Sequence, residues 1–520
     1  LGFDSADALM AAVAGAARTI AWTSDEAWVR VNATLRGPSG REFRRDHPVA
    51  SGVVVRDGDI HLDDSIRPSD DPTLMLRMAT AAARRRTRIE RRSLDRLAAE
   101  TPDFPDPWPA GASDDLVALL LAGHDGIPVL ESLDQRGLLV KALPEWAPLR
   151  SKPQRNAYHR YTVDRHLWEA AANAANLAQR VSRPDLLVLG ALLHDIGKGY
   201  PGDHTEAGIP IAERIGHRMG LPQEDVDVLV AMVRHHLLLP DVATRRDLTD
   251  DATIRTVADA VASPLVLELL GALTEADSIA TGPSAWGSWK AELVAELVDR
   301  VGHVLGGGEM SGATWSLFPG EQVLALMGTG RVHMVTDTDR LTMVSPDRPG
   351  LFWRVAGVLS LHGLDVLGAQ AHSDEQGMAA NEFRVSVPEQ GVPWDRVRRD
   401  LEHALAGELA IEARLAERAS TYRRRHKSAS KPAQPSVRVD NEASSNATVI
   451  EVRAPDRVGL LYRITRAMAE LSLDLRHARI QTLGHEVVDT FYVRTASGQK
   501  LTDRFHTAEV ERALLHAVRE

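Results

Sequence analysis

Residues 191–198 read ALLHDIGK, so an adjacent histidine and aspartate, His194 and Asp195, directly follow an apolar run. The run covers residues 186–193 and has the composition of a buried helix, which would hold both side chains stiffly. Imidazole and carboxylate together suit a borderline or hard divalent cation. A salt bridge at a helix end would use the same two residues, so a metal site requires further ligands from other parts of the chain.

Further residues of metal-ligating types occur on both sides of this pair, within segments patterned as helices. Their order along the chain is one histidine, the His-Asp pair, one histidine, two adjacent histidines and one aspartate. Successive helices of one domain, covering residues 158 to about 308, could bring them to a common pocket. The residues outside the pair are His166, His204, His235, His236 and Asp277.

This order and the local sequence resemble the HD superfamily of metal-dependent phosphohydrolases. The resemblance implies that the first histidine, the His-Asp pair and the last aspartate hold a divalent metal, Mn²⁺ or Mg²⁺. Members with two metals add further histidines. By resemblance the first set is His166, His194, Asp195 and Asp277, and the second set is His204 with one or both of His235 and His236.

Three residues are candidates for catalytic roles beside the metal. Lys198 and Arg234 could stabilise phosphate charge, although each could equally be a surface cation. His204 could shuttle a proton or could simply begin a helix, and one of the two adjacent histidines could be a packing residue. A bound divalent metal supplies hydroxide near neutral pH and offsets phosphoryl charge, so the implied reaction is phosphoester or phosphodiester hydrolysis.

The last third of the chain contains an internal repeat. From residue 341 the apolar pattern changes from period 3.6 to period 2, and D-R-x-G-L stands between a strand and a helix in both copies. The first copy predicts the order βαββαβ, ending in a strand at residues 410–415. The second copy stops before a fourth strand, so its sheet is either short or completed from elsewhere. Residues 421–446 are polar and basic, and we expect a flexible linker there.

This repeat resembles the ACT domain, a small ligand-sensing module that often binds amino acids at domain interfaces. A glycine allows a ligand to approach the backbone closely, and the following helix N-terminus offers N–H groups to a carboxylate. The aspartate could bind an ammonium group or serve as an N-cap. The expected ligand-binding residues are Asp347, Gly350 and Leu351 in the first copy and Asp456, Gly459 and Leu460 in the second.

The first 145 residues are expected to be mostly helical. Residues 6–20 and 72–99 have helical spacing, while residues 49–62 alternate around Asp57-Gly58, which is a hairpin signal. The arginines at 84–86 form a basic patch or a solvated helix face. The predicted fold class is α+β multidomain. Its parts are a helical region (1–145), an all-α HD domain (146–310), a connector (311–340) and two ferredoxin-like βαββαβ ACT domains (341–420 and 447–520).

Composition limits the remaining possibilities. With 520 residues the chain is too long for one core, and a net charge of −11 gives no global basis for binding nucleic acid or a membrane. No run of about 18 apolar residues occurs, which is the least that a membrane helix needs. The absence of cysteine fits a reducing, cytoplasmic location. The chain begins with Leu1 rather than methionine, as a fragment would.

The order of an HD domain and two ACT domains resembles the family of PII uridylyltransferase/uridylyl-removing enzymes. That family adds a nucleotidyl group, UMP or in some members AMP, to a tyrosine of the nitrogen-signalling protein PII. It removes the group hydrolytically at the HD domain, and its ACT pair senses glutamine. Local matches are YTVDRH at 161–166, HDIGKG at 194–199, GDH at 202–204, RRDLTD at 245–250 and WGSWK at 286–290.

We therefore expect metal-dependent removal of UMP or AMP from PII, regulated by glutamine, with no nucleic-acid or membrane partner. The family's transferase domain carries G-S and D-x-D. Here Gly37-Pro38-Ser39 and Asp57-Gly58-Asp59 lack that setting, so addition of the nucleotide is not expected. One alternative is a (p)ppGpp-type hydrolase, which pairs HD and ACT domains in a different order. Another is a non-catalytic glutamine sensor that binds PII, which would not need an intact metal set.

Overall fold

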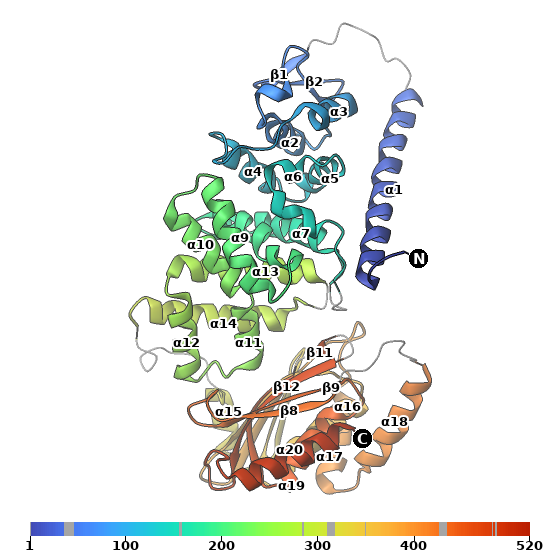
Figure 1. Cartoon of the computed structure of the whole chain (residues 1–520). Coiled ribbons are helices and arrows are strands. Elements are labelled where there is room, and N and C mark those ends of the chain that lie inside the picture. Colours follow the sequence, from blue (N-terminus) through green and yellow to red (C-terminus); the bar gives the residue numbers. More distant parts are fainter. Residues whose placement is uncertain are drawn as a thin grey trace. The chain divides into compact units, whose positions relative to one another are not determined.

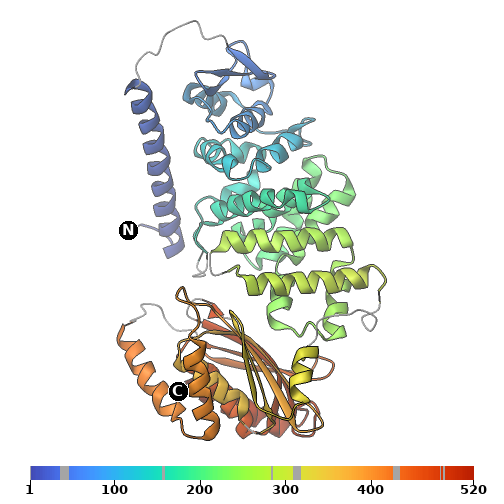
Figure 2. The ribbon, with the colours of Figure 1, turned by 180° about the vertical axis from the view of Figure 1, so that it is seen from behind.

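A computed structural model gives the structure of the chain, and its ribbon is shown from opposite sides in Figures 1 and 2. It divides into two compact units. The N-terminal unit comprises Leu1–Leu239 and Ala260–Val298, and the C-terminal unit comprises Pro240–Asp259 and Asp299–Glu520. The structure describes residues 2–35, 46–154, 159–282, 285–308, 318–348, 350–425, 434–480, 482–483 and 486–519.

The N-terminal unit begins with a long helix and a small antiparallel sheet. Helix α1 (Ala6–Leu35) precedes strands β1 (His47–Ala50), β2 (Val53–Arg56) and β3 (Asp59–Leu62). Asp57 and Gly58 both have positive φ, 54° and 88°, as a two-residue hairpin turn requires, so the predicted hairpin is confirmed. Asp57-Gly58-Asp59 is thus a turn between strands, while Gly37-Pro38-Ser39 lies outside the described residues.

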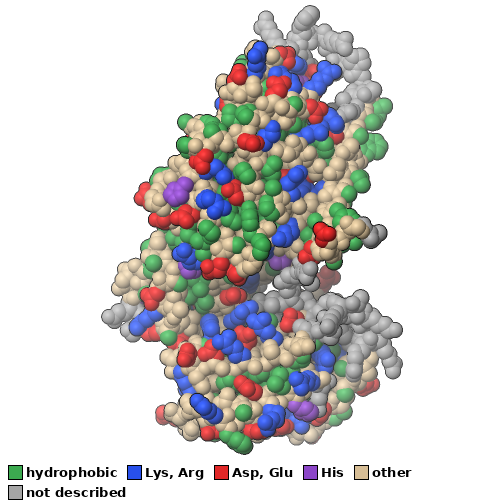
Figure 3. All heavy atoms as spheres, in the orientation of Figure 1, with side chains coloured by type: hydrophobic (Ala, Val, Ile, Leu, Met, Phe, Trp, Pro, Cys, Tyr) green, Lys and Arg blue, Asp and Glu red, His purple; other side chains and the backbone are tan. Residues whose placement is uncertain are grey.

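The stretch at residues 72–99, which has helical spacing, forms two helices. Helix α2 (Leu74–Arg84) ends before Arg86, whose φ of 53° is left-handed, and Ile89 then bridges to Ile60 of the sheet before α3 (Arg91–Glu100). The arginines at 84–86 are exposed at the end of α2, and Arg86 pairs with Asp125 at 2.8 Å. On the face drawn in Figure 3, acidic and basic side chains are interspersed.

The rest of the N-terminal unit is helical, as predicted. Helix α8 lies at its centre, packs on α7, α10 and α13, and buries every side chain from Leu186 to Leu193. Among the helices that the structure describes, no single one is long and apolar enough to cross a membrane. The helices are α4 (Ala112–Leu120), α5 (Ile127–Gln135), α6 (Leu139–Ala142), α7 (Val163–Asn176), α8 (Pro184–Leu193), α9 (His204–Arg218), α10 (Gln223–His235), α13 (Pro264–Thr281) and α14 (Ser288–Leu305).

The C-terminal unit is built on one nine-stranded sheet in which every pairing is antiparallel. Its order is β4-β5-β7-β6-β10-β12-β9-β8, with β11 beside β12. The strands are β4 (His333–Thr336), β5 (Arg340–Pro346), β6 (Val366–Ser373), β7 (Met378–Val385), β8 (Ser436–Asp440), β9 (Thr448–Pro455), β10 (Leu473–Arg479), β11 (Thr482–Leu483) and β12 (Glu486–Thr495).

Helices cover both faces of this sheet. Five helices that follow β5 share one core with the strands: α16 (Leu351–Leu361), α17 (Trp394–Ala406), α18 (Ile411–Arg425), α19 (Leu460–Glu470) and α20 (Arg504–Arg519). On the opposite face α15 (Glu321–Met327) packs on Val344 and Ala380. Helices α11 (Leu238–Arg245) and α12 (Asp251–Val261), inserted between α10 and α13, belong almost entirely to this unit.

Each ACT repeat completes its sheet with a strand from outside the predicted repeat, which for the second copy was one of the two expected alternatives. The strand predicted at residues 410–415 is wrong, because these residues enter α18, where Ile411 and Leu415 lie one turn apart and are both buried. The missing position is filled by a strand that precedes the repeat, β4 beside β5 and β8 beside β9. The second sheet is therefore completed from within the expected linker, whose residues 426–433 lie outside the described part.

The two repeats form one body. Strand β6 pairs with β10 in antiparallel register, with Ala369 opposite Ala478, so the sheet runs without a break from one repeat to the other. Helix α16 packs on α19, and the rings of Trp353 and Tyr462 meet edge to face at 5.4 Å. The two repeats therefore share a seam of backbone hydrogen bonds and a common core.

Candidate metal centre

Five helices bring the predicted ligands together. His166 lies in the second turn of α7, and Asp277 lies on α13, which begins at Pro264. His194 caps the C-terminus of the buried α8, and Asp195 follows it. His204 begins α9, and His236 caps the C-terminus of α10. Each helix meets the centre at a different point, so rigid elements fix the ligand positions.

The ligand atoms fall into two groups, each with its atoms within 4.8 Å of one another. One group is His166, His194 and Asp277, and the other is Asp195, His204 and His236. Asp195 joins them, because its Oδ2 lies 3.4 Å from His194 Nε2 while its Oδ1 lies 3.6 Å from Nε2 of both His204 and His236. A carboxylate between two histidine-rich groups is an arrangement that suits two metal ions.

The imidazoles are oriented for coordination. His194 Nδ1 lies 2.9 Å from the Ala191 carbonyl oxygen, and His236 Nδ1 lies 2.7 Å from that of Val233. A carbonyl only accepts, so each Nδ1 donates, and each Nε2 is the nitrogen left to face a metal. Among the described residues, His194 Nε2, Asp195 Oδ1 and His166 Nδ1 have no hydrogen-bond partner, and His166 Nε2 faces Asp277 Oδ1 at 3.0 Å. Buried polar atoms without partners are costly, so the donor set fits a divalent cation.

The charges of the ligand groups also favour a bound cation. Burial alone would raise the pKa of Asp195 and Asp277, but His194 and Lys198 hold the pKa of Asp195 well below its ordinary value, and His166 and His194 do the same for Asp277. Burial lowers the pKa of His194, yet the two carboxylates overcome this and raise that pKa to about 10. The buried Asp195 and the half-buried Asp277 thus demand a positive charge, which a divalent cation supplies when it displaces the imidazole proton.

A glycine sets the spacing between the His-Asp pair and α9. A Cβ atom on Gly197 would lie 1.9 Å from the carbonyl oxygen of His204 and 2.6 Å from the Gly208 nitrogen. Only glycine permits this approach, and the approach places His204 beside Asp195. Asp203 caps α9 by accepting hydrogen bonds from the backbone N–H groups of Thr205 and Glu206, which fixes the helix start.

The remaining predicted catalytic residues lie at different distances from the centre. Lys198 Nζ is 2.5 Å from Asp195 Oδ2 and donates to Gln154 Oε1 at 2.8 Å, so it lies at the edge of the centre. Arg234 is exposed and His235 is half-buried, and neither belongs to either ligand group. Neighbouring positions at a helix end point in different directions, and of the two adjacent histidines only His236 faces the ligands.

His159 was not predicted as a site residue. Its ring lies 5.3 Å from that of His166, and its Nδ1 has no hydrogen-bond partner among the described residues. Burial, with Lys198 nearby, lowers the pKa of His159 to about 4, so the ring is neutral. It extends a row of five imidazoles with centroid separations of 5.3 to 5.5 Å; the others are His166, His194, His236 and His204.

A pocket of about 200 Å³ adjoins the first ligand group. The backbone N–H of Arg160 donates to the Thr281 carbonyl at 3.1 Å, and the Thr281 hydroxyl donates to Asp277 Oδ1 at 3.4 Å. The pocket is therefore one residue away from a predicted metal ligand. Its lining combines a guanidinium group, two aromatic side chains and small or apolar groups: Arg160, Tyr161, Ile279, Ala280, Gly282 and Trp286.

The predicted ligand residues of the ACT repeats lie in two unlike loops. Gly350 and Gly459 have φ of 89° and 77° and cap α16 and α19, which begin with the buried Leu351 and Leu460. Asp347 and Asp456 are exposed. In the first loop a Cβ atom on Gly350 would lie 2.5 Å from Trp353 Nε1, whereas in the second loop the Gly459 N–H donates to the Ser360 hydroxyl of α16 at 3.0 Å.

Comparisons with known proteins agree with this architecture. The HD domain family matches residues 163–263, and the family described as "ACR9-like, ACT-like domain" matches residues 436–519. The HD match and the names of the relatives described below support a hydrolase. HD domains bind divalent metals, and the two His/Asp groups of this chain could hold such a metal.

Several curated relatives share one name, bifunctional uridylyltransferase/uridylyl-removing enzyme. The protein from Streptomyces coelicolor is 41% identical over 583 residues, which is 100% of this chain and 70% of the relative. That from Mycobacterium tuberculosis is 40% identical, over 95% of this chain and 63% of the relative, and that from Gluconobacter oxydans is 34% identical, over 74% and 48%. The chain thus belongs to the family of bifunctional uridylyltransferase/uridylyl-removing enzymes.

Proposed function

We propose that this chain removes a nucleotidyl group, UMP or alternatively AMP, from a tyrosine of the PII protein by metal-dependent hydrolysis. The observation that carries the proposal is the buried carboxylate of Asp195 between two histidine-containing groups whose lone pairs converge. A divalent metal bound there supplies hydroxide near neutral pH and offsets charge on a phosphoryl oxygen. The family relationship supports nucleotidyl removal as the reaction at this centre.

The protein's own groups orient the substrate phosphate. Lys198 lies at the edge of the centre, where its ammonium group can turn from Asp195 toward a phosphoryl oxygen. His159 is neutral, and its Nδ1 has no hydrogen-bond partner in the part of the chain that the structure describes, so it can bind the phosphodiester by a hydrogen bond without adding charge. The exposed Arg234 would act on the protein substrate rather than at the phosphorus atom.

The pocket beside Asp277 is the proposed binding site for the nucleoside. A nucleobase can stack on an aromatic side chain, and the guanidinium of Arg160 suits the ribose phosphate. We expect Trp286→Ala to raise the KM for nucleotidyl-PII about 10-fold with little change in kcat, because base stacking contributes to binding in both ground and transition states. Steady-state kinetics of nucleotide release measures both constants.

Trp289→Ala is the matched control for this variant. It removes the same side chain from the same motif, and Trp289 does not line the pocket. A KM that stays unchanged in Trp286→Ala, or rises equally in Trp289→Ala, would contradict the assignment of the pocket.

The proposed activity is tested by incubating the chain with UMP-modified and AMP-modified PII in the presence of Mn²⁺. We expect release of one nucleotide that a chelator abolishes and that Asp277→Ala removes. No release of either nucleotide by a chain that demonstrably binds Mn²⁺ would reject PII as the substrate and favour a small phosphoester such as ppGpp. The expectation that the chain does not add nucleotide is checked with UTP and unmodified PII.

Regulation by glutamine is part of the proposal. The ACT-type fold, the left-handed glycine caps of α16 and α19, and the continuous seam between the repeats support a shared amino-acid sensor. The Gly459 N–H already donates to Ser360, whereas Trp353 and Arg354 line the first loop, so the two copies are expected to bind glutamine unequally.

A further inference from the structure

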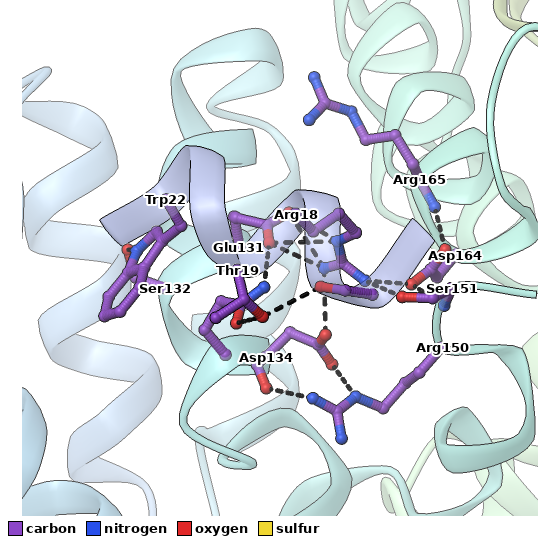
Figure 4. Close-up of polar contacts among 12 residues, drawn as sticks. Arg18, Thr19, Trp22, Glu131, Ser132, Asp134, Arg150, Ser151, Asp164 and Arg165 are labelled. Carbon is purple, nitrogen blue, oxygen red and sulfur yellow. Dashed lines mark hydrogen bonds and ion pairs between the residues drawn. The ribbon is translucent and has the colours of Figure 1, made fainter. Parts of the chain in front are cut away.

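One arginine of the first helix reaches the helix that carries the first metal ligand. Figure 4 shows Arg18 of α1 directed at carboxylates from two other helices. Its Nη2 lies 3.0 Å from Glu131 and 3.1 Å from Asp134, both on α5, and its Nη1 lies 2.5 Å from Asp164 Oδ2 on α7. The guanidinium also lies over the ring of Trp168, 5.3 Å from its centroid. One side chain thus joins three helices.

Asp164 depends on this arginine for its counter-charge. Its carboxylate is fully buried, and Arg18 is its sole cationic partner among the described residues, because the neighbouring Arg165 directs its guanidinium to Glu169. Asp134, by contrast, is held by two arginines, Arg18 and Arg150. A buried charge that loses its partner is strongly destabilising. Removal of Arg18 would therefore destabilise the surroundings of Asp164 more than those of Asp134.

Asp164 in turn fixes the first turn of α7. Its Oδ2 accepts a second hydrogen bond from the backbone N–H of Ser151 at 2.7 Å, and the Val163 N–H donates to the Lys152 carbonyl at 2.9 Å. His166 follows two residues later in the same helix; its Nε2 lies 3.0 Å from Asp277 Oδ1, and its Nδ1 has no hydrogen-bond partner among the described residues. The backbone that carries His166 toward Asp277 is therefore placed by the start of the helix, and Asp164 holds that start.

We infer that Arg18 is a positioning residue of the metal centre, which acts through Asp164 to aim His166 at the metal. The inference deepens the proposed function, since it concerns the same centre. It also gives α1 a role in hydrolysis, although Arg18 and Asp164 are 146 residues apart in the sequence. Residues that support a metal ligand from behind commonly change metal affinity by about 10- to 100-fold when they are replaced.

Metal affinity of the full chain, with no substrate present, is the direct test. We expect Arg18→Gln to weaken Mn²⁺ binding about 10-fold, measured by electron paramagnetic resonance of free Mn²⁺ at a temperature where circular dichroism matches the parent chain. Arg18→Lys keeps the positive charge but not the forked guanidinium that contacts several carboxylates, and we expect a smaller loss of Mn²⁺ affinity. If Arg18→Gln does not fold, the lysine variant carries the measurement.

Arg150→Gln is the matched control, because it removes an arginine from the same network without touching Asp164. We expect it to lower thermal stability but to leave Mn²⁺ affinity within about twofold, since Arg18 still pairs with Asp164. Unchanged Mn²⁺ affinity in the arginine-18 variants, or an equal loss in Arg150→Gln, would overturn the inference.

A double-mutant cycle tests the route. If Arg18 acts through Asp164, Arg18→Gln should cost no further Mn²⁺ affinity in an Asp164→Asn background. A further loss there would show another route and reject the inference. Because PII takes no part in these measurements, a chain that binds Mn²⁺ as expected but releases no nucleotide would refute only the proposed function. Normal nucleotide release with unaltered Mn²⁺ affinity in Arg18→Gln would refute only the role of Arg18.

Discussion

Replacement of Asp195 by asparagine is expected to lower nucleotide release by about 1,000-fold or more. The side chain keeps its shape but loses the charge that lies between the two ligand groups, 3.4 Å from His194 and 3.6 Å from His204 and His236. Stabilisation of transition-state charge by the metal is worth several kcal/mol, and a misplaced metal forfeits it. Single-turnover release from nucleotidyl-PII measures the loss, and metal analysis should show fewer bound ions.

Asp203→Asn is the control for this substitution. Asp203 lies one residue before His204, but it acts as the N-cap of α9, and asparagine caps a helix about as well as aspartate. We expect its activity to stay within about twofold of the parent chain. An Asp195→Asn variant that retained a tenth of the activity would show that the bridging carboxylate is not essential, and the two groups would then have to act separately.

The metal centre could be predicted largely because its ligands stand at ends of strongly patterned helices. The apolar run before His194 becomes the buried α8, and Pro264 begins the helix that delivers Asp277. Sequence could not choose between His235 and His236, since adjacent residues differ only in direction. It gave no sign of His159 or of the Arg18–Asp164 pair, because these contacts depend on packing between distant segments.

The sheet of the ACT repeats shows the same limit. Period-2 patterns located β5, β6, β7, β9, β10 and β12, which are 7 to 10 residues long. The order of strands in space was not predictable, because β4 and β8 complete their sheets from before each repeat. Short edge strands carry little pattern. At the position expected to be a strand, the two buried apolar residues Ile411 and Leu415 are four positions apart, which is the spacing of a helix.

Hydrogen bonds within the C-terminal unit connect the α11–α12 segment to the second ACT repeat and the residues just before it. The Asp250 carboxylate, ahead of α12, accepts hydrogen bonds from the hydroxyls of Ser444 and Ser445 at 2.8 and 2.9 Å, and the Tyr492 hydroxyl donates to the Arg245 carbonyl at 3.0 Å. The second ACT repeat therefore holds the α11–α12 segment. That segment begins two residues after His236 and leads into α13, which carries Asp277.

Ala478→Asp is therefore expected to abolish the proposed effect of glutamine on nucleotide release. Ala478 is fully buried between Ala369 of β6 and Phe491 of β12, so a carboxylate there would lie in the apolar core that the two repeats share. An unpaired buried charge costs about 4 kcal/mol, which is enough to open the seam between the repeats. Hydrogen exchange should rise across β6 and β10, and release measured with and without glutamine should become equal.

Val335→Asp is the matched control, since it adds the same charge to the same sheet. Val335 lies on the edge strand β4 and is 47% exposed, and edge strands tolerate charged side chains. We expect a normal glutamine response and unchanged exchange at the seam. If Ala478→Asp opened the seam but release still responded to glutamine, each repeat would have to act alone, and the connection through Asp250 would need only the second repeat. If both variants lost the response, the seam itself would have no special role.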